Sequence, residues 1–144
     1  MSDSLTARLL NRLLVIHYRS LAMYLRYAHP WTHRSDEPAR EVLEDIADDQ
    51  RRWVERISDV LLAERAPIGR GEFPIEFTGI HDVSLDYLVG RLIDCQRADI
   101  ETIAHCAAVL PENSTAKALA EEMLGAAKGH LQSLEELTLS GATS

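Results

Sequence analysis

The sequence has few of the residues that cross-link a chain or break its helices. Its 144 residues include 2 Cys, 5 Pro and 7 Gly, and aromatic residues make up 6%. So few cysteines exclude a disulfide-stapled scaffold, and a chain of this length can bury about two-thirds of its unfolded surface without one. Cys95 and Cys106 fall in one predicted helix, about 16 Å apart along its axis. We therefore expect two free thiols, because a disulfide needs Cα atoms within ~7 Å.

Basic residues are also scarce. Lys plus Arg number 15 against 23 Asp plus Glu, and the formal net charge is −8. Nucleic acids and anionic membrane surfaces require a basic face, so we expect neither as a partner. No run approaches the ~18 uncharged apolar residues of a membrane span. Asp3 stands where a signal peptide would carry positive charge, and we expect a soluble, cytoplasmic protein.

Helical periodicity fills the rest of the chain. Pro and Gly separate four long segments, which are residues 5–28, 37–66, 85–110 and 115–139. Each segment repeats apolar residues with the 3.6-residue period of a helix. The predicted core positions are Leu10, Leu13, Leu14, Leu21, Tyr24, Leu43, Ile46, Val54, Ile57, Leu61, Leu92, Ile93, Ile100, Ile103, Ala107, Met123, Leu124, Leu131 and Leu134. No segment alternates with the period of a strand, so the sequence predicts one all-α domain over residues 1–144.

The lengths of the connections predict the topology. The links 29–36 and 111–114 are short, so each should join antiparallel neighbours. The link 67–84 can extend to about 60 Å, whereas a 26-residue helix is about 39 Å long. Helices two and three can therefore be parallel, and we expect two antiparallel hairpins joined by a long crossover. The apolar residues of that crossover, which we expect to pack along the bundle, are Phe73, Ile75, Phe77 and Ile80.

One polar residue lies at the centre of every apolar stripe. These residues are His17, Gln50, Gln96 and His130. All four lie near the midpoints of their segments, so in a bundle of equal helices they should occupy one layer. A buried polar group without a hydrogen bond costs roughly 1–3 kcal/mol. We therefore expect the layer to be satisfied by its own members, by a ligand or by water.

Two helical hairpins, a crossover and a polar mid-core resemble the ferritin-like superfamily of bacterioferritins and rubrerythrins. In that family helices one and three each supply a Glu, and helices two and four each supply Glu-x-x-His, to a di-iron centre. The stretch 17–24 resembles the family's first helix and the stretch 46–55 its second. The matching positions are His17, Gln50, Trp53, Gln96, Ala127 and His130.

The ligand set of that family is largely missing. Four Glu positions hold two Gln, one His and one Ala, one His position holds Trp53, and only His130 remains. Iron ions need several anionic oxygen ligands, and an indole offers no lone pair. The resemblance therefore implies the fold, whereas the residues predict neither a di-iron centre nor ferroxidase activity.

Two interpretations of the layer remain open. In the first, neutral His17, Gln50, Gln96 and His130 hydrogen-bond each other and fix helix register. The chain would then be a non-enzymatic structural or interaction protein, a homodimer, with no metal or other cofactor. In the second, His17 and His130 hold a single transition metal ion, with Asp99 as a carboxylate ligand. The chain would then be a noncanonical metal-binding protein or an oxidoreductase, although Asp99 is expected to face solvent or Arg97.

Two glycines inside the last helix form a separate signal. Gly125 and Gly129 lie one turn apart, on the outward side that also carries Ala118. Each costs roughly 1 kcal/mol relative to Ala, so something should approach this face closely. We expect either the crossover or a second subunit there.

Overall fold

The computed structural model describes residues 2–28, 37–66, 68 and 85–142. Its elements are α1 (Ser2–Tyr18), α2 (Leu21–Ala28), α3 (Glu37–Ala63), α4 (Leu85–Val109) and α5 (Thr115–Ala142). The described ranges contain no strand, and the prediction of an all-α chain is confirmed. None of the described helices is both long and apolar enough to span a membrane.

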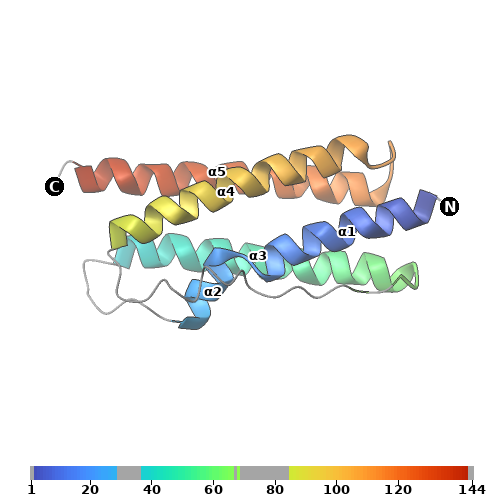
Figure 1. Ribbon diagram of the computed structural model, residues 1–144, viewed down its shortest axis with the longest axis horizontal. Coiled ribbons are helices and arrows are strands. Elements are labelled where there is room, and N and C mark those ends of the chain that lie inside the picture. The colour runs from blue at the N-terminus through green and yellow to red at the C-terminus, as the bar shows by residue number, and fades with distance from the viewer. Residues whose placement is uncertain (1, 29–36, 67, 69–84, 143–144) are drawn as a thin grey trace.

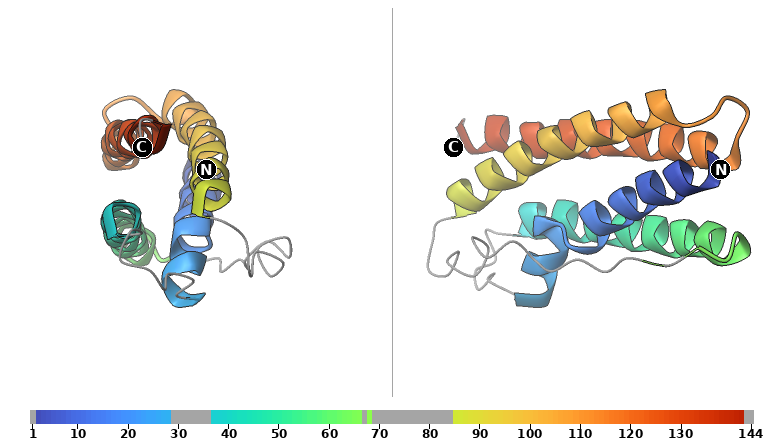
Figure 2. Two further views of the ribbon diagram at one scale, coloured as in Figure 1. Left: turned by 90° about the vertical axis from the view of Figure 1, so that its left-hand side faces the viewer. Right: turned by 45° about the vertical axis from the view of Figure 1, so that its right-hand side comes forward.

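The helices form two hairpins (Figure 1). The α1–α2 segment runs opposite to α3, and α4 runs opposite to α5, whereas α3 and α4 run in the same direction. The end of α3 and the start of α4 therefore lie at opposite ends of the bundle. Seen end-on, α3 and α5 lie on one side and α1 and α4 on the other (Figure 2), and both of these pairs are in contact.

The first segment is not the single helix that its periodicity predicts, because it breaks at Arg19–Ser20. The Ser20 hydroxyl accepts a hydrogen bond from the Met23 amide at 3.1 Å, which makes Ser20 the N-cap of α2. The same hydroxyl donates to the Gln50 side chain at 2.6 Å. A serine that satisfies a freed amide and a buried side chain at once stabilises a break that no proline or glycine signals.

Local capping explains two other helix ends. At the end of α3, Arg65 adopts the left-handed conformation with φ 56. Its amide donates to the Leu62 carbonyl at 3.0 Å, and the Ala66 amide donates to the Leu61 carbonyl at 2.9 Å. These two bonds make a Schellman motif. At the start of α5, the Ser114 hydroxyl accepts from the Lys117 amide at 3.1 Å, as expected of an N-cap.

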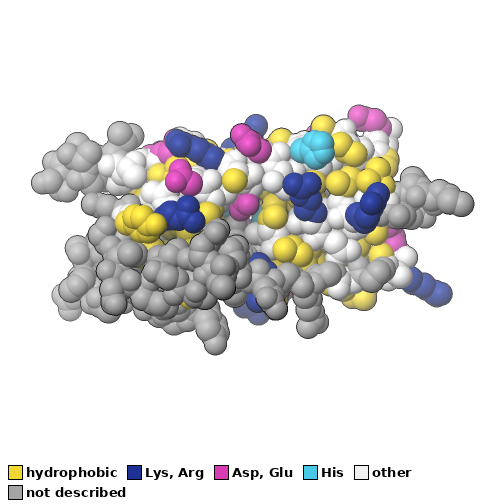
Figure 3. Space-filling model, in the orientation of Figure 1, with side chains coloured by type: hydrophobic (Ala, Val, Ile, Leu, Met, Phe, Trp, Pro, Cys, Tyr) yellow, Lys and Arg dark blue, Asp and Glu magenta, His cyan; other side chains and the backbone are white. Residues whose placement is uncertain are grey.

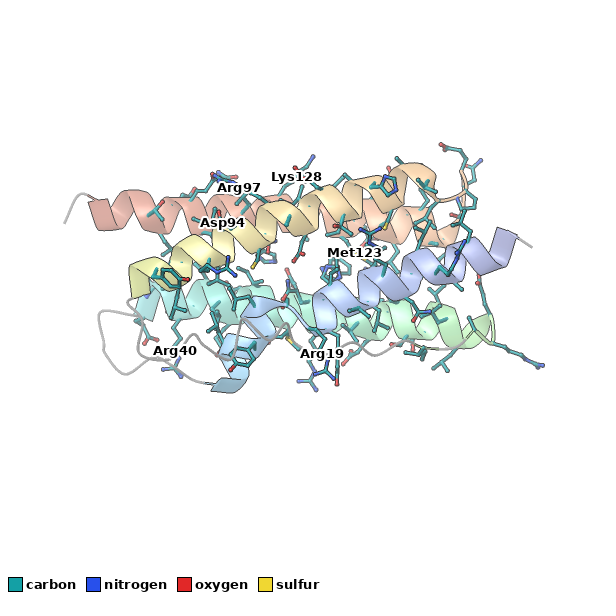
Figure 4. The ribbon with its side chains drawn as sticks, in the orientation of Figure 1. Arg19, Arg40, Asp94, Arg97, Met123 and Lys128 are labelled. Carbon is teal, nitrogen blue, oxygen red and sulfur yellow. The ribbon has the colours of Figure 1, made fainter. Side chains whose placement is uncertain are left out.

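The hydrophobic core consists of two clusters along the bundle axis. Most predicted core positions are buried, and the partly buried ones are Tyr24, Val54, Ile100, Leu124 and Leu131. Met123 lies between the helices, whereas Arg97 and Lys128 project outward (Figure 4). Neither cysteine forms a disulfide bond, as expected. The expected core residues Phe73, Ile75, Phe77 and Ile80 lie outside the described residues.

Candidate functional site

The two hydrophobic clusters are separated by a polar layer at the middle of the bundle. In the first helical segment, the buried residues of the first cluster extend from Leu9 to Leu14, and those of the second begin at Leu21. The same boundary falls between Ile46 and Ile57 of α3, and between Ala127 and Leu134 of α5. A matching gap lies between Ile93 and Ile103 of α4. Polar residues inside the four gaps include His17, Ser20, Asp49, Gln50, Gln96, Asp99 and His130.

Gln50 joins α3 to the break in the first segment. Its side chain is 5% exposed and accepts the 2.6 Å hydrogen bond from Ser20. Because that hydroxyl also caps α2, the amide and the cap depend on each other. Ser20 is itself buried, and it is a member of the layer that periodicity does not reveal.

His17 bonds to its own helix. Its Nδ1 donates a hydrogen bond to the Leu13 carbonyl at 2.7 Å, and its side chain is buried. A carbonyl can only accept, so Nε2 carries the lone pair of a neutral imidazole. Burial lowers the pKa of His17 to about 4, with the bond to Leu13 acting in the opposite direction. His17 is therefore uncharged at neutral pH.

Gln96 joins α4 to α5. Its amide nitrogen donates to the Ala127 carbonyl at 3.1 Å, and its side chain is 6% exposed. The resemblance to the ferritin-like pattern led us to expect Ala127 at a Glu position. At this residue the helix contributes its backbone carbonyl as the acceptor.

His130 lies at the seam between α5 and α3 and is less buried than the other three. Its Nε2 lies 2.7 Å from an Asp49 carboxylate oxygen, and its side chain is 17% exposed. The other Asp49 oxygen pairs with Arg52. Burial lowers the pKa of His130, whereas Asp45 raises it and Arg52 lowers it further. Asp49 is the second functional candidate that sequence periodicity does not reveal, because it lies one residue before the apolar stripe position of Gln50.

Asp99 is more enclosed than expected. The residues one or two helical turns from Asp99 on the same face of α4 are buried, and they are Leu92, Ile103 and Cys106. Arg97 does not pair with it, but instead binds Glu135 at 3.0 Å. Asp99 has no hydrogen bond or ion pair within the described part of the chain. Burial raises the pKa of this carboxyl to about 7.

The expected mutual network is replaced by separate pairs. None of the hydrogen bonds between described residues joins two of His17, Gln50, Gln96 and His130. Each finds a partner on a backbone carbonyl or on a residue outside the set. Within the residues that the structure describes, no three His, Cys, Asp or Glu side chains are grouped so that they could hold one metal ion.

Among the described residues, nothing covers the glycine face of α5. Gly125 and Gly129 are exposed, and a Cβ built on either would meet no atom of these residues within 4 Å. The crossover, which we expected to cover this face, lies almost entirely outside the described residues. The alternative occupant, a second subunit, stays a prediction.

Comparison with known proteins gives the chain no family. Neither protein-family models, nor curated proteins, nor solved structures produce a match. The functional argument therefore depends on the geometry of the polar layer and of the surface around it.

Proposed function

We propose that this chain is a ferritin-like four-helix bundle in which a hydrogen-bonded polar layer stands where that family has a di-iron centre. It serves as a non-enzymatic structural or interaction protein. The observation that carries this proposal is the set of partners in the layer. Gln50 is bonded to Ser20, and Gln96 to the Ala127 carbonyl. The hydrogen bond between the Gln50 and Ser20 side chains fixes the register of α3 against the first helical segment, at a position where the family places a carboxylate.

The arrangement of the helices supports the ferritin-like assignment. Two antiparallel hairpins with α3 and α4 in the same direction require a crossover of bundle length. The layer lies at the midpoint of this bundle, between the two hydrophobic clusters. A charged di-iron centre would need anionic oxygens here, and Gln50 and Gln96 offer neutral amides.

We further propose that the interaction partner is a second copy of the chain. Three exposed large apolar side chains, Leu5 (42%), Leu62 (62%) and Val109 (42%), belong to the start of α1 and the ends of α3 and α4. These three helix ends lie at one end of the bundle (Figure 1). Pairing of two such ends would bury apolar surface, worth about 25 cal/mol per Å². Replacing Leu62 by Glu should dissociate a dimer seen by light scattering without changing the helix content.

The iron content and Fe²⁺ oxidation activity of the untagged protein test the non-enzymatic assignment. The protein should carry less than about one iron per ten chains and should not oxidise Fe²⁺, because the anionic ligands are missing. Stoichiometric iron with ferroxidase activity would overturn the proposal. Elemental analysis of the purified protein and an Fe²⁺ oxidation assay provide the two measurements.

A single-metal centre is the second candidate, and one observation favours it. Nε2 of His17 carries a lone pair and has no partner within the described residues. If Zn²⁺, Cu²⁺ or Ni²⁺ binds through the polar layer, His17→Ala and His130→Ala should each abolish binding, and Asp99→Asn should weaken it. Binding that survives both histidine changes would place the metal elsewhere.

A further inference from the structure

A surface hollow lies between α3 and α5, at the edge of the polar layer. Its volume is about 210 Å³, and its polar lining comes from Asp45 and Asp49 of α3 and from His130 and Ser133 of α5. The face of the molecule in Figure 3 mixes basic and acidic side chains. In contrast, no Lys or Arg lines this hollow among the described residues.

Gly129 keeps the hollow open. It lines the hollow, and a Cβ built on it would meet no atom within 4 Å. A glycine inside a helix costs roughly 1 kcal/mol relative to Ala. Any larger side chain at position 129 would occupy part of the hollow. Gly125 lies one turn earlier on the same helix and does not line the hollow.

Every polar group of the hollow presents an acceptor. Ser133 uses its hydroxyl proton on the Gly129 carbonyl at 3.3 Å, which leaves its oxygen lone pairs. His130 directs Nε2 to Asp49 at 2.7 Å, so the neutral ring keeps a lone pair on Nδ1. No enclosed side-chain nitrogen or oxygen of the described residues lacks a partner, so the unpartnered Nδ1 reaches solvent. Asp45 adds a carboxylate with no ion pair within the described residues.

We propose that this hollow binds a primary ammonium group, donated by a lysine side chain of a partner protein or by a free alkylamine. An ammonium carries one positive charge and three donors, and it has no acceptor that would need satisfying. Asp45, His130 and Ser133 all line this one hollow, so an ammonium bound in it is surrounded by acceptors from three residues. A guanidinium is a planar fork suited to a bidentate carboxylate, and such a fork matches only Asp45 here.

The first experiment titrates ¹⁵N-labelled protein with 1-aminobutane, which reproduces the end of a lysine side chain. The backbone amides of Gly129 and Ser133 should shift in a saturable way. Tetramethylammonium, which has the same charge and no donor, should not produce these shifts at equal ionic strength. Equal shifts with both cations would mean a diffuse charge effect and would overturn the proposal, as would the absence of saturable shifts with either.

Two matched pairs of variants locate the site. Gly129→Leu should fill the hollow and weaken amine binding at least tenfold, whereas Gly125→Leu, the same change one turn away, should leave it within twofold. Asp45→Asn should also weaken binding at least tenfold, and Asp94→Asn on the exposed face of α4 should not. Circular dichroism of all four variants checks the fold. Equal affinity across a pair would refute the assignment of the hollow.

The pH profile provides a readout that depends on His130 itself. Protonation turns Nδ1 from an acceptor into a donor, so amine binding should be lost as the pH falls through the pKa of His130. Three charged groups of α3 act on this ring: Asp49 bonds to it, and Asp45 and Arg52 shift its pKa. His130→Gln should remove the imidazole step from the profile, and a profile that keeps the step would contradict the proposed contact.

Two further probes distinguish the sources of the ammonium. The peptide acetyl-Gly-Lys-Gly-amide should bind, and its Nε-acetyl-lysine form should not. A peptide affinity tenfold above that of 1-aminobutane would indicate a lysine of a partner protein, and equal or lower affinity a free amine. Zn²⁺ binding in the hollow without amine binding would overturn the proposal in favour of a metal site.

Discussion

Replacing Asp99 by Asn should make the protein more stable at neutral pH and should change how its stability depends on pH. The carboxyl lies in the buried face of α4 between the two hydrophobic clusters, and burial raises its pKa to about 7. In the unfolded chain this carboxyl titrates near the ordinary aspartate pKa of 3.8. The folded protein therefore binds a proton that the unfolded chain releases, and raising the pH between these two values destabilises the fold.

The magnitude follows from the difference between the two pKa values. A difference of about 3 pKa units corresponds to about 4 kcal/mol, fully expressed once the pH exceeds the folded pKa. The Asp99 side chain is partly exposed, so solvent relaxation lowers this ceiling. We expect Asp99→Asn to raise the free energy of unfolding by about 2 kcal/mol at pH 8 and to change it little at pH 4.

Urea unfolding at half-unit steps from pH 4 to pH 8 measures this effect. The relevant quantity is the difference between variant and parent, because other carboxylates contribute to both curves. Asp94→Asn makes the same chemical change at an exposed position of the same helix. Its difference from the parent in unfolding free energy should not change with pH. Parallel curves for Asp99→Asn and the parent would show that this carboxyl is not desolvated, and the reasoning would fail.

Three other changes test other parts of the molecule by the same unfolding assay. The pKa of His17 is lowered to about 4, so His17 destabilises the fold as the pH falls below 6.5. His17→Gln should remove up to about 3 kcal/mol of this loss of stability by pH 4. An unchanged dependence of the unfolding free energy on pH between 6.5 and 4 would refute this. Ser20→Ala should lower the free energy of unfolding by about 2 kcal/mol, because α2 loses its N-cap and Gln50 loses its hydrogen-bond partner. Adding Gln50→Leu should recover part of this loss. Additive effects of the two substitutions would contradict the coupling. Arg65→Gly should stabilise the protein by about 1 kcal/mol, since φ 56 favours glycine, and a lower midpoint would count against this.

Helix positions could be predicted because each depends on nearby residues. The ends at Val109 and Thr115 follow from Pro111 and the Ser114 cap, and the structure places them within one residue of the prediction. The break at Ser20 could not be predicted in this way. A serine inside a helix is nearly neutral, and its preference for capping α2 depends on Gln50, which lies 30 residues away in the sequence.

Membership of the polar layer was partly predictable, whereas its bonding was not. Helical wheels place His17, Gln50 and Gln96 correctly in the buried interior, since burial follows the apolar stripe. The hydrogen-bond partners of these residues depend on how each helix is rotated and aligned against its neighbours. Apolar periodicity does not fix this rotation and alignment accurately enough to assign single hydrogen bonds. As a result the Gln96 amide bonds to a backbone carbonyl of α5, and His130 bonds to Asp49 rather than to the other layer residues.

The division of the core explains why buried polar groups are tolerable at this level of the bundle. Two apolar clusters alone would allow a helix to slide along its neighbour, because one leucine layer resembles the next. The hydrogen bond between the Ser20 and Gln50 side chains is specific to one register, because a one-turn shift of about 5.4 Å would take the Gln50 amide away from the Ser20 hydroxyl. The amide would then be buried without a partner at a cost of roughly 1–3 kcal/mol. The layer thus converts a repetitive apolar interface into one with a single favoured alignment, which is the structural role that we assign to these residues.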